Sequence, residues 1–300
     1  MRAKLCTAIA AACLIAFTAR SAAADPTLWV VKGKDSTVYL LGTVHFLNAA
    51  QTWRTPAIDK AFRESSELWQ EFPLPVTGKG SAPGFRPDES QRMAQLWTTL
   101  GTATEGPPLT SRLTPAEAAQ LAAYVPVPKE RLDRMRPWMA AGLVGAAMLQ
   151  KLGLSASSGA DYRLAEDAVD QGKIVRGFET FEQQMHFFAD LTPDEELGYL
   201  RYSIDDAAGG MARFEAIQRA WIAGDDAAVT KLVLDQMHTL SPVFYRRFAV
   251  ERNQRWVSQI EAMLRTPGVR FVDVGDGHMM GPDGVPALLR KDGWRVEKVR

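Results

Sequence analysis

Two short stretches near opposite ends of the chain share one pattern, a strand-like apolar run that ends in Gly-x-x-His. Residues 38–45 read VYLLGTVH and residues 270–278 read RFVDVGDGH. With four histidines and 23 glycines in 300 residues, chance places about 0.3 histidines (4 × 23/300) three positions after a glycine. The pattern indicates that His45 and His278 each follow a strand of one α/β sheet, at the edge where such sheets place their ligands.

Glycine and histidine have a chemical reason to occur together at such an edge. Glycine lets the backbone leave a strand through conformations that other residues avoid, and it lets a ligand approach closely. Two neutral imidazoles held there suit a metal site or a general acid and base pair. Two unrelated histidines in strand-end turns are the alternative, and the spacing alone does not choose between them.

Residues 1–24 have the organisation of a signal peptide. A basic start precedes an apolar run over residues 5–17, and Ala22-Ala23-Ala24 forms a small-residue cleavage pattern before Asp25. We therefore expect cleavage near Ala24-Asp25 and a periplasmic or secreted product. A lipoprotein attachment at Cys13 and an uncleaved anchor are the alternatives.

The composition excludes several classes of site and partner. Both cysteines, Cys6 and Cys13, lie in the predicted signal peptide, so the mature chain has no disulfide, thiolate zinc site or cysteine nucleophile. Lys+Arg and Asp+Glu balance at 35 each, which argues against nucleic-acid binding. The longest later apolar run, residues 139–149, is too short to span a bilayer, so we expect no integral membrane span after cleavage.

The rest of the chain predicts a mixed central β-sheet, formed by N- and C-terminal strands, with a large helical middle. We expect an apolar helix over residues 137–152, buried in the middle of the domain, and later helices that break at Gly209-Gly210 and Gly224. No linker divides residues 25–300, which predicts one domain. Strands are expected at residues 28–32, 37–44, 67–72 and 174–178 and within a final strand-turn-helix-strand unit over residues 270–299.

Two carboxylates, Glu71 and Glu179, come at the ends of predicted strands. Either one suits a metal ligand or a general base, and a solvated strand-end carboxylate is the alternative. The Gly275-x-Gly277-x-x-x-Gly281 stretch is similar to a dinucleotide fingerprint, but no second series of strands and helices follows it. The glycines are better explained by a tight loop that presents His278.

Four stretches together resemble the TraB/GumN family, which is related to the TIKI metalloproteases. They are LWVVKGKDSTVYLLGTVHFL, GADYRLAEDAVDQGKIVRGFET, ERNQRWVSQIEAML and FVDVGDGHMMGPDGVPALLRKDGWRVEKV, and they are spread along nearly the whole of residues 25–300. The resemblance implies a single TraB/GumN-like domain with the sheet shared by erythromycin esterases (EreA), ChaN and TIKI proteins.

The resemblance also assigns roles to individual residues. TIKI-type proteases use the two Gly-x-x-His histidines and a glutamate, which implies that His45, His278 and Glu71 are catalytic and bind a divalent ion, Mn, Co or Zn. Arg252 would stabilise an oxyanion or hold a substrate carboxylate, and Asn253 and Glu179 would contact substrate. One departure is that Phe72-Pro73 follows Glu71, where the family usually has a second acidic residue.

The expected function is therefore an exported metal-dependent hydrolase, in the first place a peptidase, that acts on a peptide or small-molecule substrate. A metal-free hydrolase of the erythromycin-esterase type, with one histidine as general base, is an alternative. A non-catalytic protein that binds a peptide or assists polysaccharide export is another. The sequence leaves the substrate, the choice of metal and the oligomeric state open.

Overall fold

A computed structural model describes residues 25–76, 89–235, 237–238 and 241–299 of the chain. The predicted signal peptide, with Cys6 and Cys13, lies outside these residues, as do residues 77–88. Among the described residues, no helix is both long and apolar enough to cross a membrane.

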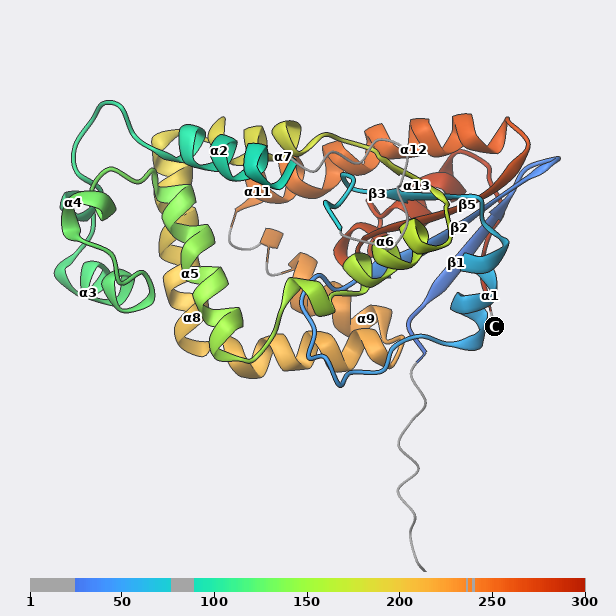
Figure 1. Cartoon of the computed structure of the whole chain (residues 1–300), viewed down its shortest axis with the longest axis horizontal. Coiled ribbons are helices and arrows are strands. Elements are labelled where there is room, and N and C mark those ends of the chain that lie inside the picture. The colour runs from blue at the N-terminus through green and yellow to red at the C-terminus, as the bar shows by residue number, and fades with distance from the viewer. Residues whose placement is uncertain (1–24, 77–88, 236, 239–240, 300) are drawn as a thin grey trace, which may run out of the picture.

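A six-stranded mixed sheet forms one side of the molecule (Figure 1). Its central pair is β2 and β5, which run parallel, and β3 and β4 extend the parallel part beyond β5. On the other side β1 pairs antiparallel with both β2 and β6. The order is β4-β3-β5-β2-β1-β6, with bounds β1 Leu28–Lys32, β2 Ser36–Thr43, β3 Glu67–Gln70, β4 Ile174–Gly177, β5 Gly268–Gly275 and β6 Val296–Lys298.

This architecture confirms the predicted α/β fold with a sheet built from both ends of the chain. The central strands are apolar on both faces because helices cover them on both sides. Leu40 and Leu41 of β2 point to opposite faces and are both fully buried, as is Phe271 of β5. Phe271 packs edge-to-face against Phe62 of the first helix, with ring centroids 5.4 Å apart.

The helices account for most of the remaining chain. They are α1 Pro56–Glu64, α2 Glu89–Gly101, α3 Pro115–Tyr124, α4 Lys129–Leu132, α5 Pro137–Lys151, α6 Ala160–Asp170, α7 Phe181–Ala189, α8 Pro193–Ile222, α9 Asp226–Val229, α11 Pro242–Tyr245, α12 Glu251–Leu264 and α13 Val285–Lys291. Single turns of 3₁₀-helix lie at η1 Leu109–Arg112, η2 Ala156–Ser158 and η5 Asp276–Met279, and π-helical turns at η3 Thr230–Asp235 and η4 Arg246–Val250.

The helices α2 to α5 and the first part of α8 form a lobe at the end of the molecule away from the strands (Figure 1). Two hydrophobic cores result, one between the sheet and its covering helices and one inside this lobe. The helix α8 belongs to both, since Leu200 and Ile204 are buried in the lobe whereas Ala220 and Trp221 are buried beneath the sheet. This long helix therefore joins the lobe to the sheet.

Two expectations about the helices are wrong. The helix α8 continues through Gly209-Gly210. A glycine inside a helix costs only about 1 kcal/mol, and packing at both ends of α8 outweighs that. The helix α5 lies in the lobe, and its buried residues all lie between Pro137 and Val144. Gly224 does end α8, with a φ of 64° that favours glycine.

We expect Phe271→Ala to lower the free energy of unfolding by about 3–5 kcal/mol, because it leaves a cavity between the sheet and α1. Urea denaturation measures this change. The matched control is Ile174→Ala on the edge strand β4, where the side chain is 37% exposed and the expected cost is less than about 1 kcal/mol. Equal costs for the two variants would contradict the assignment of Phe271 to the centre of the core.

Candidate functional site

The parallel strands bring three of the predicted site residues to one edge of the sheet. His45 follows β2, Glu71 directly follows β3, and His278 lies in η5 directly after β5. Because parallel strands end at the same edge, residues more than 200 positions apart meet there. The Nε2 atoms of His45 and His278 lie 3.6 Å and 3.8 Å from the same oxygen, Oε1 of Glu71.

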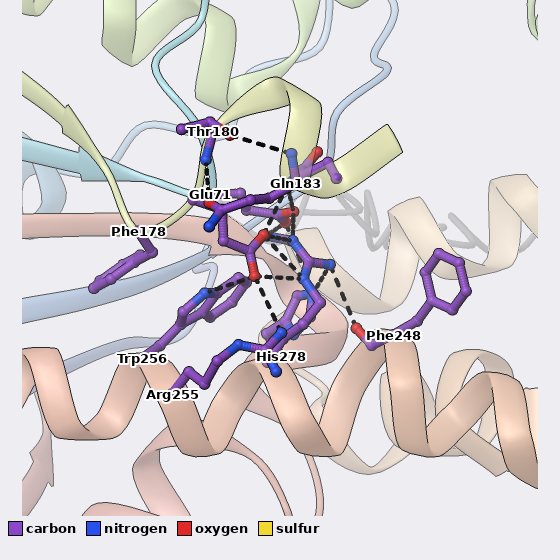
Figure 2. Close-up of polar contacts among 12 residues, drawn as sticks. Glu71, Phe178, Thr180, Gln183, Phe248, Arg255, Trp256 and His278 are labelled. Atoms are coloured by element: carbon purple, nitrogen blue, oxygen red, sulfur yellow. Dashed lines mark hydrogen bonds and ion pairs between the residues drawn. The ribbon is translucent and has the colours of Figure 1, made fainter. Parts of the chain in front are cut away.

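Arg252, from the first turn of α12, lies at the centre of this cluster. Its Nη2 donates to Oε2 of Glu71 (2.6 Å) and to Oε2 of Glu179 (2.8 Å), and its Nε donates to both Glu179 oxygens at 3.1 Å. The guanidinium also lies over the ring of Trp256, 4.7 Å from the centroid. Trp256 Nε1 donates to Oε1 of Glu179 (3.1 Å), and Figure 2 shows this network between Glu71, Trp256 and His278.

Glu71 accepts hydrogen bonds on both of its oxygens. Oε1 accepts from the backbone N–H of Gly275 (2.8 Å), and Oε2 accepts from Arg252 and from Nε2 of Gln184 (3.0 Å). Burial alone would raise the pKa of Glu71, but Arg252 and the two histidines outweigh it and hold this pKa well below its usual range. Glu71 is therefore an ionised and fully engaged carboxylate.

His278 is a neutral histidine with a defined tautomer. Its Nε2 lies 3.1 Å from Nη1 of Arg252, which only donates, so Nε2 accepts. Its Nδ1 therefore carries the proton and donates to Oδ1 of Asn253 (2.6 Å), whose Nδ2 donates to the carbonyl of Asp283 (2.8 Å). Burial and the neighbouring Arg252 lower the pKa of His278 to about 3.

His45 has a different environment. Its Nδ1 lies 2.8 Å from Oδ2 of Asp161, at the start of α6, and 46% of its side chain is exposed. Burial alone would lower the pKa of His45, but the carboxylates of Asp161 and Glu71 outweigh it and raise this pKa to about 9. The ring is thus oriented by a carboxylate, charged at neutral pH and open to solvent on the side of a cavity.

The cavity beside His45 has a volume of about 270 Å³. Polar groups, among them Glu71, Gln184, Thr43, Asp161 and Asp273, make up one part of its wall. Aromatic and aliphatic side chains make up the rest (Phe46, Phe72, Leu74, Tyr162, Ala156 and Val274). A reactive centre next to an apolar pocket is the usual arrangement of a small-molecule or peptide site.

The first glycine of each motif allows these side chains to approach the backbone. A Cβ on Gly275 would lie 3.0 Å from Nε2 of His45 and 3.1 Å from Oε1 of Glu71. A Cβ on Gly42 would overlap the side chain of Asp276. The sequence suggests that these glycines let a ligand approach closely. In the structure the groups that approach them are side chains of the protein itself, namely His45, Glu71 and Asp276.

His45, His278 and Glu71 match a divalent ion in donor type, since two imidazoles and a carboxylate suit zinc, manganese or cobalt. Two ligands of one ion lie roughly 3.4 Å apart in a tetrahedral site, close to the distances from Glu71 to the two histidines. In this conformation Arg252 already occupies the lone pair of His278. A metal ion held here therefore requires Nη1 of Arg252 to leave His278. Among the described residues, no group of three or more His, Cys, Asp or Glu side chains is already arranged around a metal position.

Asn253 and Glu179 contact other residues of the cluster. Asn253 is 1% exposed and uses its side chain for His278 and Asp283, while Glu179 holds Arg252 and Trp256. The substrate contacts expected of both residues stay predictions. The other two histidines do not join the cluster, since His186 lies beside Asp190 and His238 lies against Tyr245.

Three residues of this region escaped the sequence analysis: Asp161, Gln184 and Asp273. Asp161 and Gln184 lie in α6 and α7, and no motif in the sequence marks either one as a site residue. Asp273 had a clearer signal, because it is the one charged residue in the apolar run FVDVG of a central strand. A carboxylate on a buried strand is rare unless it has a partner.

Comparison with known proteins places the whole described chain in one family. A sequence model of the TraB/PrgY/gumN family matches residues 27–298. An uncharacterized protein of Treponema pallidum (strain Nichols) is 23% identical over 274 residues, 88% of this chain and 80% of that protein. The uncharacterized protein YbaP of Escherichia coli (strain K12) is 29% identical over 153 residues, 51% of this chain and 56% of YbaP. No solved structure matches the chain significantly.

We expect Arg252→Met to lower the free energy of unfolding by about 3–5 kcal/mol, because it leaves the buried carboxylates of Glu71 and Glu179 without their counter-charge. Arg255→Met, three positions further along α12, is the matched control. Arg255 is 51% exposed and lies 3.8 Å from Glu179, so its loss should cost less than about 1 kcal/mol. Similar urea midpoints for the two variants would show that the buried ion pairs do not form.

The two motif histidines should be distinguishable by ¹⁵N NMR in the metal-free protein. We expect His278 to stay neutral with its proton on Nδ1 from about pH 8 to about pH 5, because its pKa is lowered to about 3. His45 should stay protonated up to about pH 9. His45→Gln and His278→Gln variants assign the two signals. If both rings titrate near their ordinary pKa, the different environments described here are wrong.

Proposed function

The chain belongs to the TraB/PrgY/gumN family, and on that basis we propose that it is a hydrolase that cleaves an acyl bond, in the first place a peptide bond. One observation carries this proposal. Two histidines of opposite character, an ionised glutamate and a buried arginine converge beside a cavity at the strand ends of the sheet. Acyl hydrolysis needs these parts: a group that handles a proton, a polarising cation and a pocket for the substrate.

Each side chain has a task that follows from its contacts. Asp161 orients the ring of His45, so that Nε2 of His45 faces Glu71 and is available either to bind a metal ion or, without a metal, to move a proton at the reacting water or leaving group. Arg252 is buried and permanently charged, and it supplies positive charge where a carbonyl oxygen becomes an oxyanion. Asn253 and Glu179 are positioning residues in this scheme, since they hold His278 and Arg252 in place.

We propose that His45, His278 and Glu71 hold a divalent ion, Mn, Co or Zn, in the active protein. When bound, such an ion would polarise the scissile carbonyl and lower the pKa of a water molecule. The environment of Glu71 favours its role as ligand over its role as base, because Arg252 and the two histidines hold its pKa well below its usual range and so make it a poor proton acceptor. Arg252 would then give up its contact with His278 and keep its contacts with Glu71 and Glu179.

The contact between His45 and Asp161 favours a second candidate, hydrolysis without a metal. A carboxylate that orients a histidine is the arrangement by which a general base is held in the correct tautomer. In that case His278 and Arg252 keep the contact described above, and His45 alone handles the proton.

The cellular location and the substrate class are also part of the proposal. The composition of residues 1–24 supports export to the periplasm or beyond the cell. A peptide or small molecule is the proposed substrate, because the cavity beside His45 is small and mostly apolar in its walls.

Elemental analysis of the purified protein is the first test. We expect about one equivalent of Mn, Co or Zn per chain, lost in His45→Ala and in His278→Ala because each removes a ligand. The control is His186→Ala, which changes a histidine outside the cluster and should retain the metal.

A fluorogenic peptide library should then be cleaved by the metal-loaded protein and by His186→Ala, but at least about 100-fold more slowly by His45→Ala. Absence of metal after reconstitution would contradict the metal site. Turnover that survives chelators but is lost in His45→Ala and Asp161→Asn would instead establish the metal-free mechanism. If no acyl substrate is cleaved under either condition, the hydrolase proposal is wrong.

A further inference from the structure

Three buried oxygen atoms around the cavity beside His45 have no hydrogen-bond partner within the described protein. They are Oγ1 of Thr43, Oδ1 of Asp161 and Oδ1 of Asp273. All three residues line the cavity, and Thr43 and Asp273 are only 2% and 1% exposed. Buried polar groups are nearly always paired, so three such oxygens on one cavity indicate a missing donor.

The sheet and α6 place these three oxygens together. Leu41 of β2 lies opposite Asp273 of β5, and Thr43 is two residues further along β2, so its side chain points to the same face. Asp161 begins α6, which lies over the sheet near the end of β3 (Figure 1). Nε2 of Gln70 bridges the two layers, because it donates to Oδ2 of Asp273 (3.3 Å) and to the carbonyl of Asp161 (3.1 Å).

The second oxygen of each carboxylate is already in use. Oδ2 of Asp161 holds His45 and Oδ2 of Asp273 holds Gln70, which leaves the two Oδ1 atoms free to accept. Two carboxylate oxygens and one hydroxyl in the wall of the cavity thus lack a donor within the described protein. Burial and the neighbouring Asp161 raise the pKa of Asp273, so a cationic ligand would relieve the repulsion between the two carboxyl groups, whereas an anionic ligand would add to it.

A primary ammonium group matches this set of acceptors. It carries three N–H donors, no acceptor and one positive charge, whereas a water molecule has only two donors. Besides His45, Gln70, Glu71 and Gln184, the rest of the cavity wall is apolar, and it includes Phe46, Phe72 and Tyr162. Its volume of about 270 Å³ is below the roughly 300–1,000 Å³ of pockets for drug-sized ligands, so it suits a group the size of one residue.

We propose that this cavity binds the free α-ammonium group of a peptide that begins with an apolar or aromatic residue. Thr43, Asp161 and Asp273 would receive the three N–H groups, and the aromatic wall would contact the first side chain. The bond to be cleaved would then lie close to the N-terminus of the substrate. That last statement rests on the proposed hydrolase function, whereas the binding of the ammonium group does not.

Binding of small probes to the whole protein tests the proposal without any turnover. In isothermal titration calorimetry at neutral pH, we expect L-phenylalaninamide to bind at least about tenfold more tightly than N-acetyl-L-phenylalaninamide, which lacks the charge. Nα-acetyl-L-lysinamide carries its ammonium group on a long side chain and should also bind at least about tenfold more weakly. Equal affinity for the acetylated phenylalanine probe would overturn ammonium binding, and equal affinity for the lysine probe would overturn the N-terminal assignment.

Two substitutions identify the acceptors. Asp273→Asn and Thr43→Val keep the shape of the side chains, and each should weaken the binding of L-phenylalaninamide by about tenfold without changing the weak binding of its acetylated form. The matched control is Asp276→Asn, because Asp276 is also a buried carboxylate with an unpaired oxygen but does not line the cavity. Unchanged affinity in both test variants, with melting temperatures near that of the unmodified protein, would overturn the proposal.

Failure of this inference and failure of the proposed function give different results. If the protein cleaves peptides with free and with acetylated N-termini equally well, the ammonium site is wrong and the hydrolase proposal stands. If L-phenylalaninamide binds as expected but no acyl substrate is cleaved, the ammonium site stands as a binding site and the hydrolase proposal fails.

Discussion

The burial of Arg252 between two carboxylates is the interaction on which the rest of the site depends. Arg252 comes from α12, Glu71 from the end of β3 and Glu179 from the segment after β4, and the guanidinium is 6% exposed. Removing three charged groups from water costs several kcal/mol per ion, which good geometry must offset. The hydrogen bonds from Arg252 and Trp256 provide that geometry, so α12 and the parallel strands are held in one arrangement around the site.

The same arrangement makes two identical motifs chemically different. His278 lies on the arginine side of the cluster, where it is neutral and buried, whereas His45 lies on the carboxylate side, next to Asp161 and half exposed. One histidine is thereby suited to hold a group in place and the other to exchange a proton with a ligand in the cavity. Glu71 lies between the two histidines, and one of its oxygens, Oε1, lies close to Nε2 of both rings.

Much of the fold could be predicted because its signals are local. The apolar runs of β2 and β5 marked buried strands, which the structure confirms. The errors arose where packing overrides local preference. A glycine pair weakens an isolated helix, but α8 is buried in two cores at its two ends and therefore continues through Gly209-Gly210.

The sequence by itself determined which reactive residues occur at strand ends, since periodicity and glycine placement mark where a strand stops: His45, Glu71, Glu179 and His278. Only the tertiary structure decided which partner each one meets. His45 and Asp161 are 116 positions apart and Arg252 and His278 are 26 positions apart, and no local pattern in the sequence signals either contact. Such partners depend on strand order, on register and on which helix covers which face. These are properties of the packed sheet as a whole, so no stretch of the sequence specifies them alone.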